Sequence, residues 1–289
     1  MAAKTQKVQK TNLLLEFFYR MTKSFSSKLG LILLLLIVLL CLVGPFFSPY
    51  EINGVDLLNM YSGPSKAHLL GCDAMGRDML TRLMYGGRYS LALGVCASLF
   101  GALVGVVIGS VGGYFGGITE TIIMRLMDVW SALPGILLCI LVSSAMGSGF
   151  FATVIALTVG GVPGTVRMIR GQILSERTKE YIEAAQSINC SSFMIMFKHL
   201  LPNVIQPIIV TTTMGIGSTM IMAASLSYIG LGIQPPNPEW GAMLSDGRSY
   251  IRVYPHMILV PGIIIALTVF AINLLGDGVR DALDPKLRD

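Results

Sequence analysis

Long hydrophobic runs separated by polar segments dominate the sequence. A helix needs about 20 apolar residues to cross the hydrocarbon core of a bilayer, and six runs approach that length. They cover residues 29–47, 90–114, 121–144, 151–168, 204–227 and 257–276. The pattern therefore predicts an all-α membrane protein with six transmembrane helices, which places both ends of the chain on the same side of the membrane.

The polar segments differ in their content of basic residues. The tail 1–28, the segment between the fourth and fifth spans and the C-terminal end carry fourteen Lys and Arg, whereas the borders and interiors of loops 48–87 and 230–254 carry six. In membrane proteins, cytoplasmic segments contain more Lys and Arg than segments on the opposite side of the membrane. We therefore expect 1–28 to be a cytoplasmic tail, 29–289 to form the transmembrane domain, and the two polar loops to lie outside.

Small residues and prolines interrupt the apolar runs. Gly101, Gly105, Gly109 and Gly113 recur every fourth residue in the second span, a spacing that lets helices approach closely in lipid. We expect this stripe to pack against another helix, with a pore-lining face as the alternative. Pro134 removes a backbone hydrogen bond and predicts a kink or a break in the third span.

An amphipathic pair of short helices is predicted in residues 176–203, the segment between the fourth and fifth spans. Two sets of apolar residues have the spacing that places them on one face of a helix. The first set is Tyr181, Ala184, Ala185 and Ile188, and the second is Phe193, Met196, Phe197 and Leu200. Asn189 separates the sets and tolerates a left-handed turn. Ser191 or Ser192 would cap the second helix, and Pro202 would end it. The pair either projects and docks into another protein or lies among lipid headgroups.

Composition supports a membrane protein and gives little support to an enzyme. Charged residues make up 13% of the chain, against about 25% in a typical soluble domain. The net charge of +5 follows from topology, so it does not indicate nucleic-acid binding. No C-x-x-C spacing, phosphate-binding Gly-Lys-Ser/Thr loop or His-Glu-x-x-His is present. We therefore expect no disulfide, metal site, catalytic residue or cofactor in this chain.

The segment 176–203 also carries a family motif. Glu183, Ala184 and Ala185, followed by Leu201, Pro202 and Asn203, resemble the cytoplasmic loop of the inner-membrane permeases of binding-protein-dependent ABC importers. Asn189 stands where that family has glycine. The resemblance implies that Glu183, Ala184, Ala185, Asn189, Leu201 and Pro202 couple the chain to an ATPase. We call residues 176–203 the coupling loop.

Two further segments resemble the dipeptide, oligopeptide and nickel permease subfamily. The first carries Gly71, Asp73, Gly76, Arg77, Asp78, Arg82, Gly86, Arg88 and Ser90, with Cys72 where threonine is usual. Here Asp78 and Arg82 have the spacing of helix partners. The second is the proline-rich loop 230–254, which contains Trp240. Arg77, Asp78 and Trp240 are candidates for docking a binding protein; otherwise the loop is a re-entrant plug, and the first segment a solvated helix.

The resemblance implies a type I ABC importer permease in the bacterial inner membrane, working by alternating access. Its expected partners are a second homologous permease, two subunits that bind ATP and Mg, an extracytoplasmic substrate-binding protein and the lipid bilayer. Hydroxyl groups in the fifth span either pack against neighbouring helices or line a wet path, and we favour packing. Because this span forms part of the path in the family, Thr212 and Met222 are the path candidates.

The sequence leaves alternatives open for the substrate and for the class of protein. Small peptides are the expected substrate, and nickel or a metal chelate is the alternative within the same subfamily. A secondary transporter working alone would need an intramembrane acid and an inverted repeat, neither of which is clear in the sequence. A structural scaffold would need neither the stiff outer loop nor the cytoplasmic helix pair.

Overall fold

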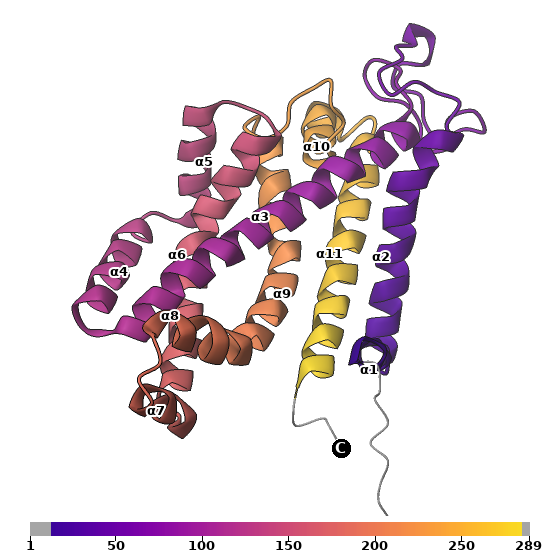
Figure 1. Cartoon of the computed structure of the whole chain (residues 1–289). Coiled ribbons are helices and arrows are strands. Elements are labelled where there is room, and N and C mark those ends of the chain that lie inside the picture. Colours follow the sequence, from indigo (N-terminus) through magenta and orange to yellow (C-terminus); the bar gives the residue numbers. More distant parts are fainter. Residues whose placement is uncertain (1–12, 285–289) are drawn as a thin grey trace, which may run out of the picture.

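The computed structural model describes residues 13–284, with side chains described from Phe17 onward. This part of the chain is almost entirely helical (Figure 1). Its helices are α1 (Leu13–Met21), α2 (Phe25–Val43), α3 (Met79–Phe115), α4 (Gly117–Trp130), α5 (Gly135–Met146), α6 (Phe150–Arg177), α7 (Glu180–Ser187), α8 (Ser192–Met194), α9 (Leu201–Tyr228), α10 (Trp240–Gly247) and α11 (His256–Leu283). A π-helical turn at Ile195–Leu200 joins α8 to α9, and short 3₁₀ turns lie at Gly44–Phe47, Leu57–Asn59 and Arg248–Tyr250.

Within residues 13–284, five helical segments are long and apolar enough to cross a membrane, and α4 with α5 forms a sixth, broken one. The chain bends by 80° between α4 and α5. The expected span 121–144 is therefore not one helix. Pro134 lies directly before α5, and its ring keeps the preceding residue from helical angles. The other expected spans lie inside α2 with its 3₁₀ extension, α3, α6, α9 and α11.

The long helix α3 runs obliquely across the bundle and packs along α6 (Figure 1). Three of the four glycines in its stripe allow this close approach. A Cβ on Gly109 would lie 2.9 Å from the Val166 carbonyl oxygen, and one on Gly113 would lie 2.9 Å from the Arg170 carbonyl oxygen. A Cβ on Gly105 would meet the Thr165 side chain, but a Cβ on Gly101 would meet nothing within 4 Å. The predicted packing role is therefore confirmed for three of the glycines.

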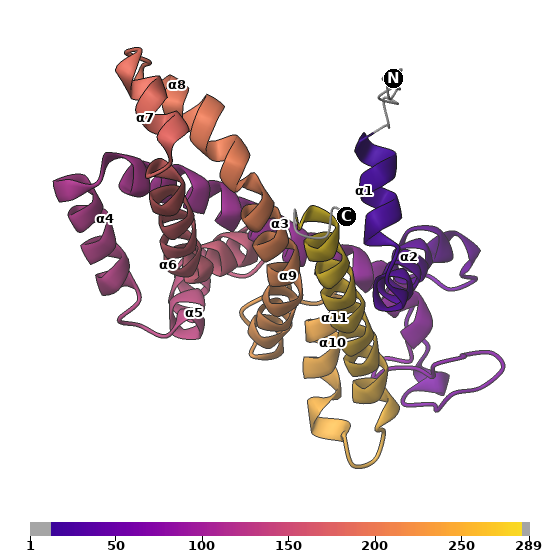
Figure 2. The ribbon, with the colours of Figure 1, turned by 90° about the horizontal axis from the view of Figure 1, so that it is seen from below.

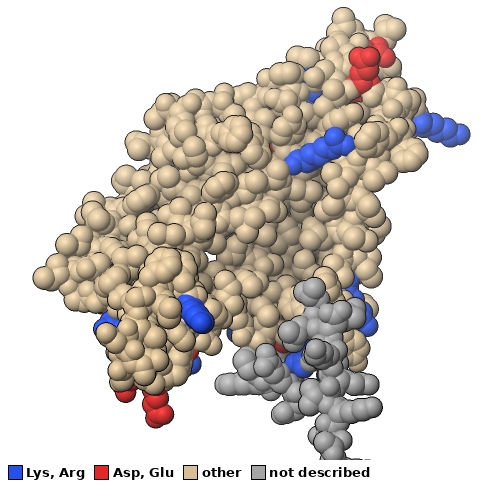
Figure 3. Space-filling view, in the orientation of Figure 1, with Lys and Arg blue, Asp and Glu red and all other residues tan. Residues whose placement is uncertain are grey.

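The two ends of the bundle carry different structures. Helix α1, the coupling loop and the end of α11 lie at one end, whereas α10 and the loop 48–78 lie at the other (Figures 1 and 2). On the face shown in Figure 3, charged side chains gather towards these ends and leave an uncharged belt between them. A belt of this kind matches a hydrocarbon layer, in which charged side chains are rare.

Candidate functional site

The coupling loop forms the first of the two predicted short helices, whereas the second is the start of a helix that continues into α9. Helix α7 ends at Ser187, and Asn189 adopts the left-handed conformation, with φ of 60°. The Ser191 hydroxyl then accepts the Met194 backbone N–H at 3.3 Å and caps the next helix. Both local predictions, the asparagine turn and the serine cap, are confirmed. The pair projects away from the bundle when seen from below (Figure 2).

One face of the coupling loop is buried against the bundle. Ile182 is 0% exposed and Ala185 is also buried. They share a core cluster with residues from the ends of three long helices, which are Tyr114 of α3, Ile169 and Ile173 of α6, and Val204 and Ile208 of α9. Burying a side chain as large as isoleucine contributes about 1.5–3 kcal/mol. The loop is therefore packed as part of the body and not attached by its ends alone.

The buried face differs from the predicted one. Helical spacing predicts that Tyr181 and Ile188 share a buried face with Ala185, but Tyr181 and Ile188 are exposed and Ile182 takes the buried position. In the second helix the predicted face also divides, because Met196 and Leu200 are buried while Phe193 and Phe197 are exposed. A π-helical turn has more residues per turn than an α-helix, which shifts the positions that face inward.

The opposite face of the coupling loop is apolar and exposed. Ile188 is 76% exposed, and Met194 is exposed as well. The rings of Phe193 and Phe197 lie 4.3 Å apart and are both exposed. The side chains of Glu183 and Ala184 are exposed on α7. Exposed apolar side chains gathered at one end of a protein are typical of an interaction site.

Pro202 does not end the second helix, contrary to the sequence prediction. Helical structure continues through Leu201 and Pro202 into α9. The preceding π-helical turn accommodates the proline, since the Leu201 N–H bonds to the Met196 carbonyl five residues back. The Asn203 side chain donates to the His199 carbonyl oxygen at 2.6 Å. The coupling loop therefore passes into α9 without a flexible joint.

Tyr181 ties α7 to the two helices that flank it. Its hydroxyl donates to a Glu176 carboxylate oxygen at 2.7 Å and accepts from the Asn203 side chain at 3.2 Å. Partial burial and the bond to Glu176 raise the pKa of Tyr181 to about 12. The phenol thus remains protonated at physiological pH and keeps donating to Glu176.

A small cavity lies between α3, α6 and α9 and is lined mostly by small and hydroxyl side chains. Its volume is about 210 Å³. The lining includes Gly101, Ser98, Thr158, Thr165, Thr211, Thr212, Ser218 and Thr219 and contains no charged residue. The structure thus places Thr212 on this cavity. Met222 instead packs against the apolar cluster that includes Leu93 and Leu157.

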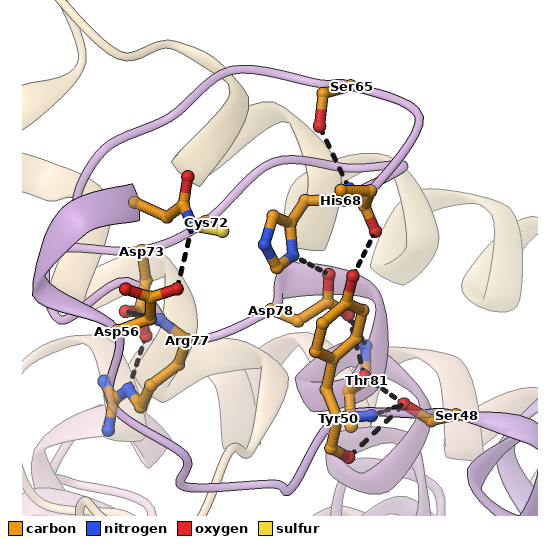
Figure 4. Close-up of polar contacts among 12 residues, drawn as sticks. Ser48, Tyr50, Asp56, Ser65, His68, Cys72, Asp73, Arg77, Asp78 and Thr81 are labelled. Carbon is orange, nitrogen blue, oxygen red and sulfur yellow. Dashed lines mark hydrogen bonds and ion pairs between the residues drawn. The ribbon is translucent and has the colours of Figure 1, made fainter.

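Arg77 and Asp78 belong to a buried polar network in loop 48–78, and Asp78 joins this loop to the start of α3 (Figure 4). The Arg77 Nε donates to Asp73 at 2.6 Å. The Asp78 carboxylate accepts the Thr81 backbone N–H at 2.8 Å and lies 3.0 Å from His68 Nδ1. Arg82 lies 3.4 Å from Asp73, so the predicted Asp78–Arg82 pair is wrong. Each side chain of these pairs is buried.

Trp240 holds α10 against α3. Its side chain is 0% exposed, and its Nε1 donates to the Leu83 carbonyl oxygen at 2.9 Å. Its backbone N–H donates to Ser90, which also donates to the buried Glu239 at 2.7 Å. Arg77, Asp78 and Trp240 are all buried, and each holds its own part of the chain in place. The structure shows this structural role, and docking of a binding protein by these residues stays a prediction.

Comparisons with known proteins identify the family. Residues 101–289 match the model of the binding-protein-dependent transport system inner membrane component. Residues 12–64 match the N-terminal transmembrane domain of oligopeptide transport permease C. The chain belongs to the binding-protein-dependent transport permeases. This permease is therefore a multi-pass inner-membrane protein and not an enzyme, and it works with an ATPase and a substrate-binding protein.

Relatives and solved structures agree with this assignment. The glutathione transport system permease GsiD of Pectobacterium atrosepticum is 43% identical over 274 residues, covering 94% of this permease and 91% of the relative. GsiD of Escherichia coli is also 43% identical, covering 94% of this permease and 90% of the relative. A chain of the MetNI methionine ABC transporter, solved in inward-facing conformations, matches with a TM-score of 0.60 and 20% identity over 71% of this permease and 98% of that chain. The last match shows the fold alone.

Three features of this permease do not follow from the patterns in its sequence. Ile182, the anchor of the coupling loop, lay one position from the predicted face. The contact of Tyr181 with Glu176 joins residues five apart, a spacing that the helix-pair rules do not consider. The hydroxyl-lined cavity forms only where three helices distant in sequence meet, so it could not be predicted from one segment. The enrichment of Ser and Thr in the fifth span was a partial signal for it.

The Asn189 turn gives a prediction. Asn189→Gly should leave assembly with the ATPase and transport unchanged, because glycine adopts positive φ freely. Asn189→Val should weaken assembly, because a β-branched residue at this φ costs about 1–2 kcal/mol or more. Pull-down of the ATPase by each purified variant measures this. Loss of assembly with glycine, or full assembly with valine, would show that the turn does not shape the coupling loop.

Proposed function

We propose that this permease forms half of the translocation pathway of an ATP-driven importer of small peptides. A second homologous permease completes the pathway, and two ATPase subunits bind ATP and Mg on the cytoplasmic side. The observation that carries the proposal is the two-faced coupling loop. Its Ile182 face is buried in the bundle, and its Ile188 face is apolar and exposed.

The coupling loop transmits motion because it is continuous with two spanning helices. At its start, α6 ends only three residues before α7 begins. At its end, helical structure passes without a break into α9. A push on the exposed face therefore moves α6 and α9 together, and these helices line the hydroxyl cavity. This contact explains how ATP-driven closure of the ATPases tilts the pathway.

The cavity chemistry supports a peptide substrate. Hydroxyl groups such as Ser98, Thr158 and Thr212 offer hydrogen bonds to amide and carboxylate groups without fixing a charge. A lining of this kind accepts peptides whose side chains differ in charge. The glutathione permeases that are 43% identical to this chain act on a tripeptide, which also favours peptides over nickel or a metal chelate.

A different outer surface suits the substrate-binding protein, since the earlier docking candidates are buried. Leu57 and Leu58 lie on the 3₁₀ turn at Leu57–Asn59, and Leu58 is 97% exposed. The turn is held firmly, because the Asp56 carboxylate accepts the Leu58 N–H at 3.1 Å and the Asp56 N–H donates to the Met75 carbonyl at 3.2 Å. An exposed apolar tip on a rigid loop is suited to fill a pocket on a partner.

The coupling role predicts an uncoupled variant. Glu183→Arg should abolish peptide uptake while the permease still inserts, because Glu183 is exposed on the face that meets the ATPase. Proteoliposomes with the complete transporter would be assayed for uptake of a labelled dipeptide, glutathione and radioactive nickel. Asp281→Arg, an exposed acid on α11, is the matched control.

Normal uptake by Glu183→Arg would contradict the coupling role. Uptake of nickel and not of peptides by the unaltered transporter would contradict the proposed substrate. The two outcomes are separate, because the first compares variants with one substrate and the second compares substrates with one protein.

The proposed docking tip predicts a defect in recognition of the binding protein. Leu58→Asp should raise the concentration of binding protein needed for half-maximal uptake by about tenfold or more, as expected when a central apolar contact is lost. Leu58→Met keeps an apolar side chain and should behave as the unaltered permease. An unchanged half-maximal concentration in Leu58→Asp would remove this tip from the docking surface.

A further inference from the structure

A second cavity of about 440 Å³ lies where α2 meets the start of α3, at the end of the bundle that carries the outer loops. Its apolar lining comes from both helices and from the loop above them. The apolar residues that line it are Leu40, Gly44, Phe47, Pro49, Ala67, Leu69, Leu80 and Met84. Nothing in coupling or translocation, as described above, uses this cavity.

The position of the cavity places it at the membrane boundary. The candidate span that contains α2 ends at Phe47. Leu40, on the cavity wall, is 38% exposed, and Phe46 and Phe47 beside it are about four-fifths exposed. These apolar side chains face lipid, because they belong to the end of a spanning segment. The cavity is therefore accessible to the acyl chains and headgroups of the surrounding leaflet.

The polar groups on the cavity wall are already satisfied, with one exception. Ser48 and Thr81 share a hydrogen bond of 2.6 Å, and the Tyr50 hydroxyl donates to the Ala67 carbonyl oxygen at 2.6 Å. Asp78 accepts from Thr81 and contacts His68 (Figure 4). Among the described residues, the Lys66 ammonium has neither an ion pair nor a side-chain hydrogen bond, and its side chain is exposed.

We propose that this cavity binds a phospholipid with an anionic headgroup. One acyl chain lies in the apolar part of the cavity, beside the point where Gly44 and Met84 bring α2 and α3 into contact, and the phosphate lies at Lys66. An apolar groove at the membrane boundary with a single unpaired cation above it matches this combination of chain and charge. The bound lipid fills the gap between α2 and the outer loop.

The test is native mass spectrometry of the full chain, purified from its membrane in mild detergent and titrated with phosphatidylglycerol or phosphatidylcholine. We expect one phosphatidylglycerol per chain, bound about fivefold more tightly than phosphatidylcholine, the effect of about one Lys at an anionic headgroup. Lys66→Glu should remove this preference, and Lys66→Arg should keep it. Arg252→Glu alters an exposed cation that does not line the cavity and should have no effect.

A second variant tests the acyl-chain site independently of charge. Ala67→Trp places a large ring in the cavity and should displace both lipids. Equal affinity for the two lipids in the unaltered chain would overturn the proposal. So would the same lipid preference in Lys66→Glu as in Arg252→Glu, or undiminished lipid binding in Ala67→Trp.

Discussion

The burial of Ile182 and Ala185 is the contact on which the proposed mechanism depends, because these residues pack with the π-helical turn Ile195–Leu200 in one apolar cluster that extends to α3, α6 and α9. A loop exposed on both faces would move when an ATPase moves, but it would not move the helices. A loop buried on both faces would offer the ATPase nothing to bind. A loop with one face packed into the bundle and the other face exposed can both bind the ATPase and move the helices.

The two ends of the molecule are built for different tasks. At the coupling end, apolar packing and the Tyr181 bonds make the loop part of the body. At the opposite end, buried polar contacts around Asp73 and Asp78 fix the outer loop to α3, and Trp240 fixes α10. Between them, α3 and α6 meet where the glycines of α3 leave room for Ile169 and Ile173 of α6. Such an interface allows close contact between helices that must move relative to other parts of the transporter.

Features governed by neighbouring residues could be predicted from the sequence. Six apolar runs, the left-handed turn at Asn189 and the cap at Ser191 each follow from local chemistry. Pro202 failed as a stop signal because a π-helical turn absorbs it, and no rule for single residues anticipates that turn. Ile182 was missed because α7 packs against the π-helical turn Ile195–Leu200, and helical spacing within α7 does not reveal that contact.

The buried charged residues also could not be predicted from local sequence patterns. Arg77 and Asp78 were interpreted as surface residues because isolated charges usually are, and their partners Asp73 and His68 became evident only in the folded loop. Trp240 in a proline-rich loop resembled a docking residue, but the close approach of α10 to Gly87 of α3 buries it. Long-range pairing of this kind cannot be deduced from spacing in one sequence.

The most direct test of the central claim is the amount of peptide imported per ATP hydrolysed by an Ile182→Ala transporter in proteoliposomes. Truncating this buried side chain lowers the stability of the packing between the coupling loop and the bundle by about 2–5 kcal/mol and leaves the exposed face of the loop intact. The account predicts that the ATPases still assemble and hydrolyse ATP while the peptide imported per ATP falls several-fold. Unchanged import per ATP in an assembled Ile182→Ala transporter would contradict it.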